Sequence, residues 1–103
     1  MPRQPEGRLV GRILTYCRGR QGRWTKVHGG DPYQESGISD ILGCYRGRFV
    51  AIEVKRPGGK VSPLQQRFLE DVEKAGGYAI VAESVGDVRE LLDTISHDIQ
   101  IES

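Results

Sequence analysis

Apolar side chains recur every three or four residues in three stretches of the chain, and this spacing predicts three amphipathic helices. The first covers residues 5–18. The second begins at the cap Ser62 and ends at the glycines 76–77, because Ser-Pro-x-Gln is a strong helix start and glycine a common stop. The third is marked by apolar positions between residues 88 and 95, and we expect residues 96–103 to form a polar end beyond it.

Four short runs of β-branched, aromatic and other apolar residues lie between these helices and predict four strands. They fall at residues 23–27, within 39–45, at 49–55 and at 78–82. A turn at Arg46-Gly47 makes the second and third runs a hairpin, and the helix after the third run returns the chain so that the fourth lies parallel to it. The order α-β-β-β-α-β-α predicts one α/β domain over residues 1–103, with a mixed sheet.

Composition excludes several classes of protein. The longest apolar runs, such as residues 79–82, are far too short to span a bilayer, and no apolar stretch follows the charged N-terminus, so we expect neither an anchor nor a secretory leader. Cys17 and Cys44 form no C-x-x-C pair, which excludes a disulfide scaffold and a zinc ribbon and predicts a reduced, cytoplasmic protein. Residues 59–62 end like a P-loop but lack its earlier glycine, so we expect no nucleotide cofactor.

The net charge of +1 hides an asymmetry along the chain. Residues 1–60 hold 12 Lys and Arg against five Asp and Glu, a net +7, whereas residues 61–103 hold three against nine, a net −6. A basic half favours a phosphate-binding face, although two ordinary solvated surfaces would give the same counts. The candidate phosphate contacts are Arg8, Arg12, Lys26, Arg56 and Lys60.

Two carboxylates and a lysine stand out in the predicted hairpin. Side chains alternate between faces along residues 49–55, so Glu53 and Lys55 share one face near the end of that strand. Antiparallel pairing brings Asp40 beside Glu53, and two neighbouring carboxylates bind a hard cation such as Mg²⁺. Such a cation polarises a phosphodiester and activates water, while Lys55 stabilises charge on the phosphate. A plain Glu–Lys ion pair and an Asx turn at Asp40 are the structural alternatives.

Four motifs follow one another along the chain: GISD at residues 37–40, EVKRPGGK at 53–60, SPLQQRF at 62–68 and AGG at 75–77. Together they resemble the VRR-NUC domain of the PD-(D/E)XK nuclease superfamily. The resemblance extends over nearly the whole chain and implies the αβββαβ core of restriction-endonuclease-like proteins, here with an extra C-terminal helix. The family usually has proline before the metal-binding aspartate, whereas this chain has Ser39, so we expect a looser loop there.

The resemblance implies Asp40 and Glu53 as metal ligands and Lys55 as the catalytic lysine. To the metal ligands we add the backbone carbonyl of Val54. The implied metal is Mg²⁺, for which Mn²⁺ is able to substitute.

The resemblance also implies Gln65 as a further catalytic residue and Glu6 as an acidic residue that joins the metal site. Each has a second interpretation from the sequence itself. Gln65 fits a capping box with Ser62, in which its side chain returns to the cap amide. Glu6 fits a first-turn carboxylate that the helix dipole favours.

We therefore expect a metal-dependent endonuclease that hydrolyses phosphodiester bonds of branched DNA, such as four-way (Holliday) junctions, in a bacterial or phage-infected cell. The sequence contains no second DNA-reading module, so specificity should come from DNA shape or from a second copy of the chain. A two-fold homodimer would offer two sites to two strands. A monomeric flap or nicking nuclease and a non-catalytic nucleic-acid-binding module are the alternatives.

Overall fold

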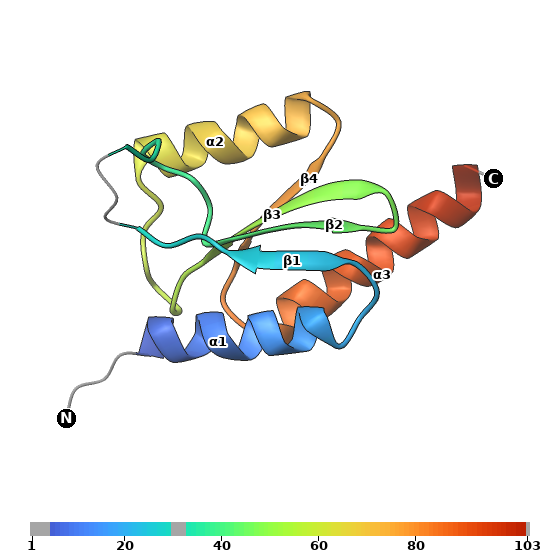
Figure 1. Ribbon diagram of the computed structural model, residues 1–103, viewed down its shortest axis with the longest axis horizontal. Coiled ribbons are helices and arrows are strands. Elements are labelled where there is room, and N and C mark those ends of the chain that lie inside the picture. The colour runs from blue at the N-terminus through green and yellow to red at the C-terminus, as the bar shows by residue number, and fades with distance from the viewer. Residues whose placement is uncertain (1–4, 30–32, 103) are drawn as a thin grey trace.

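The computed structural model of the chain describes residues 5–29 and 33–102, and Figure 1 shows its path. Seven elements occur in the predicted order. They are α1 (Pro5–Arg18), β1 (Arg23–Lys26), β2 (Ile41–Tyr45), β3 (Arg48–Val54), α2 (Pro63–Lys74), β4 (Tyr78–Ala82) and α3 (Val85–Glu102). Within the described ranges, none of the helices is long and apolar enough to cross a membrane.

The strands form one sheet in the order β1-β2-β3-β4. β1 and β3 each pair antiparallel with β2, whereas β4 pairs in parallel with β3 across the α2 crossover. Arg46 (φ 53°) and Gly47 (φ 85°) form the left-handed two-residue turn that a tight hairpin favours, and this turn aligns Tyr45 with Arg48. The α/β fold with a mixed sheet, the αβββαβ order and the additional C-terminal helix are confirmed.

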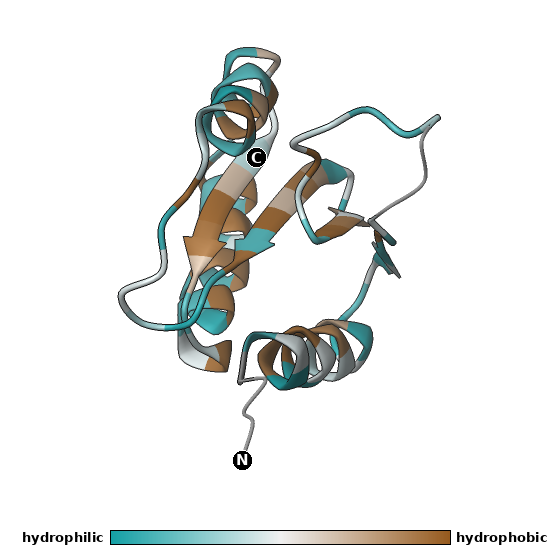
Figure 2. Cartoon of the chain, turned by 90° about the vertical axis from the view of Figure 1, so that its left-hand side faces the viewer, coloured by the Kyte–Doolittle hydropathy of each residue, from teal (hydrophilic) through white to brown (hydrophobic). Residues whose placement is uncertain are grey.

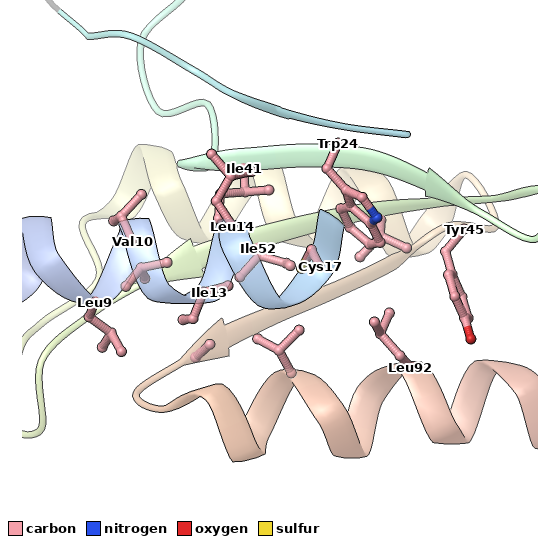
Figure 3. Close-up of a cluster of buried hydrophobic side chains, with 14 of the residues drawn as sticks. Leu9, Val10, Ile13, Leu14, Cys17, Trp24, Ile41, Tyr45, Ile52 and Leu92 are labelled. Atoms are coloured by element: carbon pink, nitrogen blue, oxygen red, sulfur yellow. The ribbon is translucent and has the colours of Figure 1, made fainter. Parts of the chain in front are cut away.

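Helices α1 and α3 cover one face of the sheet, and α2 covers the other face over β3 and β4 (Figures 1 and 2). The larger core lies against α1 and α3 and includes Ile13, Ile52 and Leu92, all fully buried (Figure 3). The smaller core packs Leu69 and Val72 of α2 around Ala51 of β3. Full burial of each large apolar side chain contributes roughly 1.5–3 kcal/mol to folding, so these two cores hold β3 at the centre.

The expected polar end after residue 95 is wrong, because α3 continues to Glu102. Two long-range contacts stabilise its last turns. Glu102 forms an ion pair with Arg48 of β3, and Asp98 accepts a hydrogen bond of 2.8 Å from the Tyr78 hydroxyl of β4. These contacts join the last turns of α3 to the sheet, and helical spacing of apolar residues does not report them.

Helix α2 differs from the sequence pattern in one respect. Helical spacing predicts one common face for Leu64, Phe68, Val72 and Ala75, but Leu64 is 58% exposed and Ala75 is exposed as well. Leu69 is buried in its place and packs with Val72 against the sheet. The first turn of α2 therefore presents an apolar side chain to solvent.

Candidate active site

The hairpin of β2 and β3 brings Asp40 and Glu53 to the same end of the sheet. Ile41 pairs with Ile52, and one further step of this antiparallel register sets Asp40 opposite Glu53. Directly opposite residues in an antiparallel pair point to the same face, so both carboxylates lie on the α2 side. The short turn at Arg46 and Gly47 fixes this alignment from the far end of the hairpin.

Asp40 is held from both neighbouring strands. Its backbone carbonyl accepts a hydrogen bond from the Val27 amide (2.8 Å), and its carboxylate Oδ2 accepts one from the Val54 amide (2.8 Å). The carboxylate thus bonds to β3, across the hairpin, and this is not the local bond of an Asx turn. Because the N–H and C=O of one strand residue point to the same side, the Val54 carbonyl also points towards the Asp40 side of β3.

Glu53 is a buried carboxylate that is only partly satisfied. Its side chain is 1% exposed, and Lys55 Nζ lies 3.5 Å from its Oε2, while its Oε1 has no hydrogen-bond partner among the described residues. Burial and, after it, the negative charge of Asp40 raise the pKa of Glu53, Lys55 lowers it and Glu6 raises it slightly, and the net value is about 7. The ion pair with Lys55 forms, but it does not compensate the buried charge.

These donors fit a hard divalent cation. Mg²⁺ takes oxygen donors of the kind present here: a buried carboxylate oxygen that has no partner within residues 5–29 and 33–102, a second carboxylate opposite it and a nearby backbone carbonyl, with water filling the other positions. In the described part of the chain, no group of three or more His, Cys, Asp or Glu is gathered closely enough to hold a metal. Glu6 is near enough to influence the pKa of Glu53, and its role as a ligand stays a prediction.

The segment after β3 folds back over Lys55. Arg56 and Gly59 close a turn in which the Gly59 amide donates to the Arg56 carbonyl (2.9 Å). A Cβ on Gly59 would lie 3.4 Å from the Cβ of Lys55, so the turn packs against the lysine stem, whose side chain is only 13% exposed. Arg56 and Lys60 of the same segment are exposed.

The other predicted site residues lie on separate elements: Gln65 on α2, Arg8 and Arg12 on α1, and Lys26 on β1. The Gln65 side chain accepts a hydrogen bond from the Ser62 amide (2.9 Å), and the Gln65 amide donates to the Ser62 hydroxyl (3.2 Å), so the capping box is formed. A catalytic role for Gln65 stays a prediction. Among the candidate phosphate contacts outside the 56–60 segment, Arg8 and Arg12 are exposed on α1 and Lys26 is exposed at the end of β1.

Two features of the loop before Asp40 are not visible in the sequence pattern. Ser39 is fully buried, and its hydroxyl has no hydrogen-bond partner among the described residues. This position is thus packed inside the protein, and the expectation of a looser loop at Ser39 stays a prediction. Gly37 adopts a φ of 86° and touches the first turn of α2: a Cβ there would lie 2.8 Å from the backbone carbonyl of Leu64.

Comparison with known proteins gives one family. Residues 16–86 match the family model described as the VRR-NUC domain. A solved structure described as a VRR_NUC domain protein superposes with a TM-score of 0.72 at 14% identity, covering 91% of this chain and 89% of the other. A second, described as a VRR_NUC domain, also has a TM-score of 0.72, at 27% identity, covering 88% and 97%. No curated protein matches the chain significantly.

Proposed function

The chain belongs to the VRR-NUC domain family and is thus a nuclease domain of restriction-endonuclease-like fold, and we propose that it is a metal-dependent endonuclease of branched DNA. A nuclease domain implies DNA as the substrate. The finer proposal names the metal, the residues that hold it and the shape of the DNA.

The observation that carries the proposal is the state of Glu53. This carboxylate is 1% exposed, faces a second carboxylate and has one oxygen without a partner in the described part of the chain, which is costly for the fold. Structural charges are normally paired, whereas ionisable groups with strongly shifted pKa values concentrate at functional sites. A divalent cation would satisfy the unpaired oxygen and offset the repulsion between the two carboxylates.

Each residue of the site has its own role in the proposed reaction. Asp40, Glu53 and the Val54 carbonyl would hold Mg²⁺ or Mn²⁺, and the cation, when bound, polarises the phosphodiester and lowers the pKa of a water molecule. Lys55, held beside Glu53, donates hydrogen bonds either to the attacking water or to the phosphate oxygens on which negative charge develops. Attack in line with the leaving oxygen would leave a 5′-phosphate on the product.

The exposed cations of the basic half are the proposed contacts to the DNA backbone. Arg56 and Lys60 lie, exposed, on the segment that covers Lys55, and they would contact phosphates next to the one that is cut. Arg8, Arg12 and Lys26 would contact phosphates farther away. Contacts of this kind carry no base specificity, so DNA shape must select the substrate.

A homodimer would provide the shape selection. Two copies related by a two-fold axis would present two sites to two strands, which is the symmetry of a four-way junction. A monomer that nicks or trims flaps is the alternative enzyme, and its substrate would need only one site. A non-catalytic DNA-binding module is the alternative without chemistry.

One assay separates these functions. The full chain is incubated with a linear duplex, a 5′ flap and a four-way junction of matched sequence, each with Mg²⁺, with Mn²⁺ and with EDTA. We expect paired, symmetric cuts in the junction that require metal, little cutting of the duplex, and no cutting by Glu53→Gln. The exposed Glu102→Gln is the matched control and should cut like the wild type.

The alternatives predict other results. Single cuts in the flap by a species that sediments near 11.5 kDa would support the monomeric nuclease and contradict the dimer. DNA binding without cuts under all conditions would support the binding module. Cleavage in EDTA, or by Glu53→Gln at the wild-type rate, would contradict the metal site.

A further inference from the structure

Two large apolar side chains are exposed on segments that border the candidate active site. Tyr33 is 96% exposed and lies in the loop that leads to Asp40. Leu64 is 58% exposed in the first turn of α2, which directly follows the segment covering Lys55. Exposed apolar residues scattered singly need no explanation, so these two are informative only if the structure holds them together.

Gly37 holds the two segments together. With φ at 86° and no side chain, it lets the loop approach the Leu64 backbone so closely that a Cβ would lie within 2.8 Å of it. Figure 1 shows the loop between β1 and β2 reaching the N-terminal end of α2. Tyr33 precedes this contact by four residues and Asp40 follows it by three. The loop and the first turn of α2 therefore form one rim beside the site.

The capping box makes the α2 side of this rim rigid. Ser62 and Gln65 exchange two hydrogen bonds around the first turn, and Pro63 fixes its first backbone angle. Leu64 lies between these residues, so its backbone is held while its side chain remains in solvent. An apolar side chain on a rigid, exposed turn is ready to contact a ligand at low entropic cost.

The chemistry of the rim distinguishes between kinds of DNA. A leucine side chain and a tyrosine ring offer a phosphate neither a charge nor, apart from the tyrosine hydroxyl, a hydrogen-bond donor, and the bases of an intact duplex are stacked inside the helix. Unstacked bases expose apolar faces, which pack against aromatic and aliphatic side chains, while neighbouring cations bind the backbone. Here the exposed Arg56 and Lys60 precede α2 and supply those cations.

We infer that Tyr33 and Leu64 contact unstacked bases at the branch point next to the phosphate that is cut. This inference rests on the proposed nuclease function and specifies its substrate: DNA with unpaired or unstacked bases within a few nucleotides of the cut. The rim binds these bases and thereby sets the position of the branch relative to Asp40, Glu53 and Lys55.

The experiment measures affinity by fluorescence anisotropy in EDTA, so that the DNA stays uncut. The full chain is titrated with a junction or flap, with a duplex of the same length, and with the branched DNA made abasic at the branch. We expect the paired change Tyr33→Ala with Leu64→Ala to weaken binding of branched DNA about tenfold or more and to leave duplex binding unchanged. Ile101→Ala, which alters another exposed aliphatic side chain at the end of α3, should change neither.

The abasic DNA tests for base contact directly. If the side chains touch bases, removing the bases weakens the wild type by the same factor, and the double variant no longer responds to their removal. Tyr33→Phe should retain wild-type affinity, because stacking needs the ring and not the hydroxyl. All variants alter exposed side chains, so folding is preserved.

Three results would overturn the inference. The first is an equal loss of affinity for duplex and branched DNA, and the second is full sensitivity of the double variant to abasic DNA. The third is a change in sedimentation of the double variant, which would make the rim a contact between two copies of the chain. Failure of the proposed function is distinct from all three, because it appears as absence of metal-dependent cleavage by the wild type.

Discussion

Both ends of the β2–β3 hairpin hold charged groups, but the two sets of charges are satisfied to different degrees. At the turn end, the Arg20 guanidinium donates hydrogen bonds to the hydroxyls of Tyr16 (2.6 Å) and Tyr45 (2.9 Å) and pairs with Asp93 (3.2 Å). It also lies over both tyrosine rings, 5.9 and 5.5 Å from their centroids. Ser96 shares a further hydrogen bond with Tyr45 (3.0 Å). This network is satisfied.

At the other end, Glu53 faces a like charge and leaves one carboxylate oxygen without a partner among the described residues. This contrast distinguishes charged groups that serve the fold from charged groups that serve a function. A satisfied charge network fixes elements to one another, here α1 and α3 to the end of β2. A buried charged group that the fold leaves without a hydrogen-bond partner indicates a function that folding alone does not explain.

The largest expected effect comes from replacing a cation at each end. Lys55→Met removes the ammonium beside Glu53, and we expect the cleavage rate to fall by about 10²–10³, the loss typical for one group that stabilises developing charge. Arg20→Met removes a cation of similar length from the satisfied network. Its folded fraction should cleave at the wild-type rate, measured on a four-way junction at a temperature where both variants are folded.

If Arg20→Met lost activity as Lys55→Met does, the two ends would not differ in function. An active Lys55→Met would equally contradict the assignment, because β3 itself contains no lysine that could replace Lys55.

The next effect is a dependence of stability on pH that belongs to Glu53. In metal-free buffer its folded pKa, about 7, lies above the usual Glu value near 4.5. Between these values the folded state holds a proton that the unfolded state has lost, so the free energy of unfolding falls as pH rises from about 4.5 to 7. The total loss is up to about 3 kcal/mol. Glu53→Gln cannot ionise, and its stability should stay level over this range.

The measurement is thermal unfolding of both proteins in EDTA from pH 5 to pH 8. Glu53→Gln should gain stability relative to the wild type towards pH 8. Parallel pH profiles of the two proteins would show that Glu53 is not a strained carboxylate.

Arg20→Met should have the opposite effect to Lys55→Met: it should lower the stability of the fold and leave cleavage by the folded protein unchanged. Arg20→Met leaves the hydroxyls of Tyr16 and Tyr45 without their charged donor. Hydrogen bonds to a charged group contribute about 1.5–3 kcal/mol, and partial exposure of Arg20 and Asp93 reduces the total, so we expect a loss of about 2 kcal/mol. Urea unfolding at pH 7 measures it. A loss below about 0.5 kcal/mol would make the network an ordinary surface cluster.

The smallest expected effect compares two glycines with nearly the same backbone angle. Gly37 (φ 86°) touches Leu64, whereas a Cβ on Gly47 (φ 85°) would meet nothing within 4 Å. Gly47→Ala should lower the free energy of unfolding by about 1 kcal/mol, because alanine disfavours a left-handed backbone. Gly37→Ala should lower it by about 1–2 kcal/mol more and should weaken binding of Mn²⁺, because the loop that carries Asp40 must shift. Equal losses in both variants would show that the contact with Leu64 does not position the loop.

The pairing of Asp40 with Glu53 follows from the sequence because every link is local. Arg46-Gly47 predicts a two-residue turn, the turn fixes the register, and a period of two fixes the shared face. The capping box at Ser62 is likewise local and forms as the spacing predicts. These features need no knowledge of the rest of the chain.

Long-range contacts decide what the sequence does not predict. The end of α3 depends on Arg48 and Tyr78, which lie in other elements. Burial of Ser39 and exposure of Leu64 depend on how the loop meets α2. Gly37, with its positive φ, lies at that contact. A sequence pattern gives the faces of an element but not what covers each face.

Titration of the metal-free protein with Mn²⁺ by isothermal calorimetry at pH 7.5, without DNA, directly tests whether Asp40 and Glu53 form a metal site. The structure predicts saturable binding to the wild type and to Glu102→Gln, and loss of that binding in Asp40→Asn and in Glu53→Gln. The same titration followed by thermal unfolding should show that Mn²⁺ stabilises only the proteins that bind it. A wild type that binds no Mn²⁺, or carboxylate variants that bind it as well as the wild type, would contradict the account.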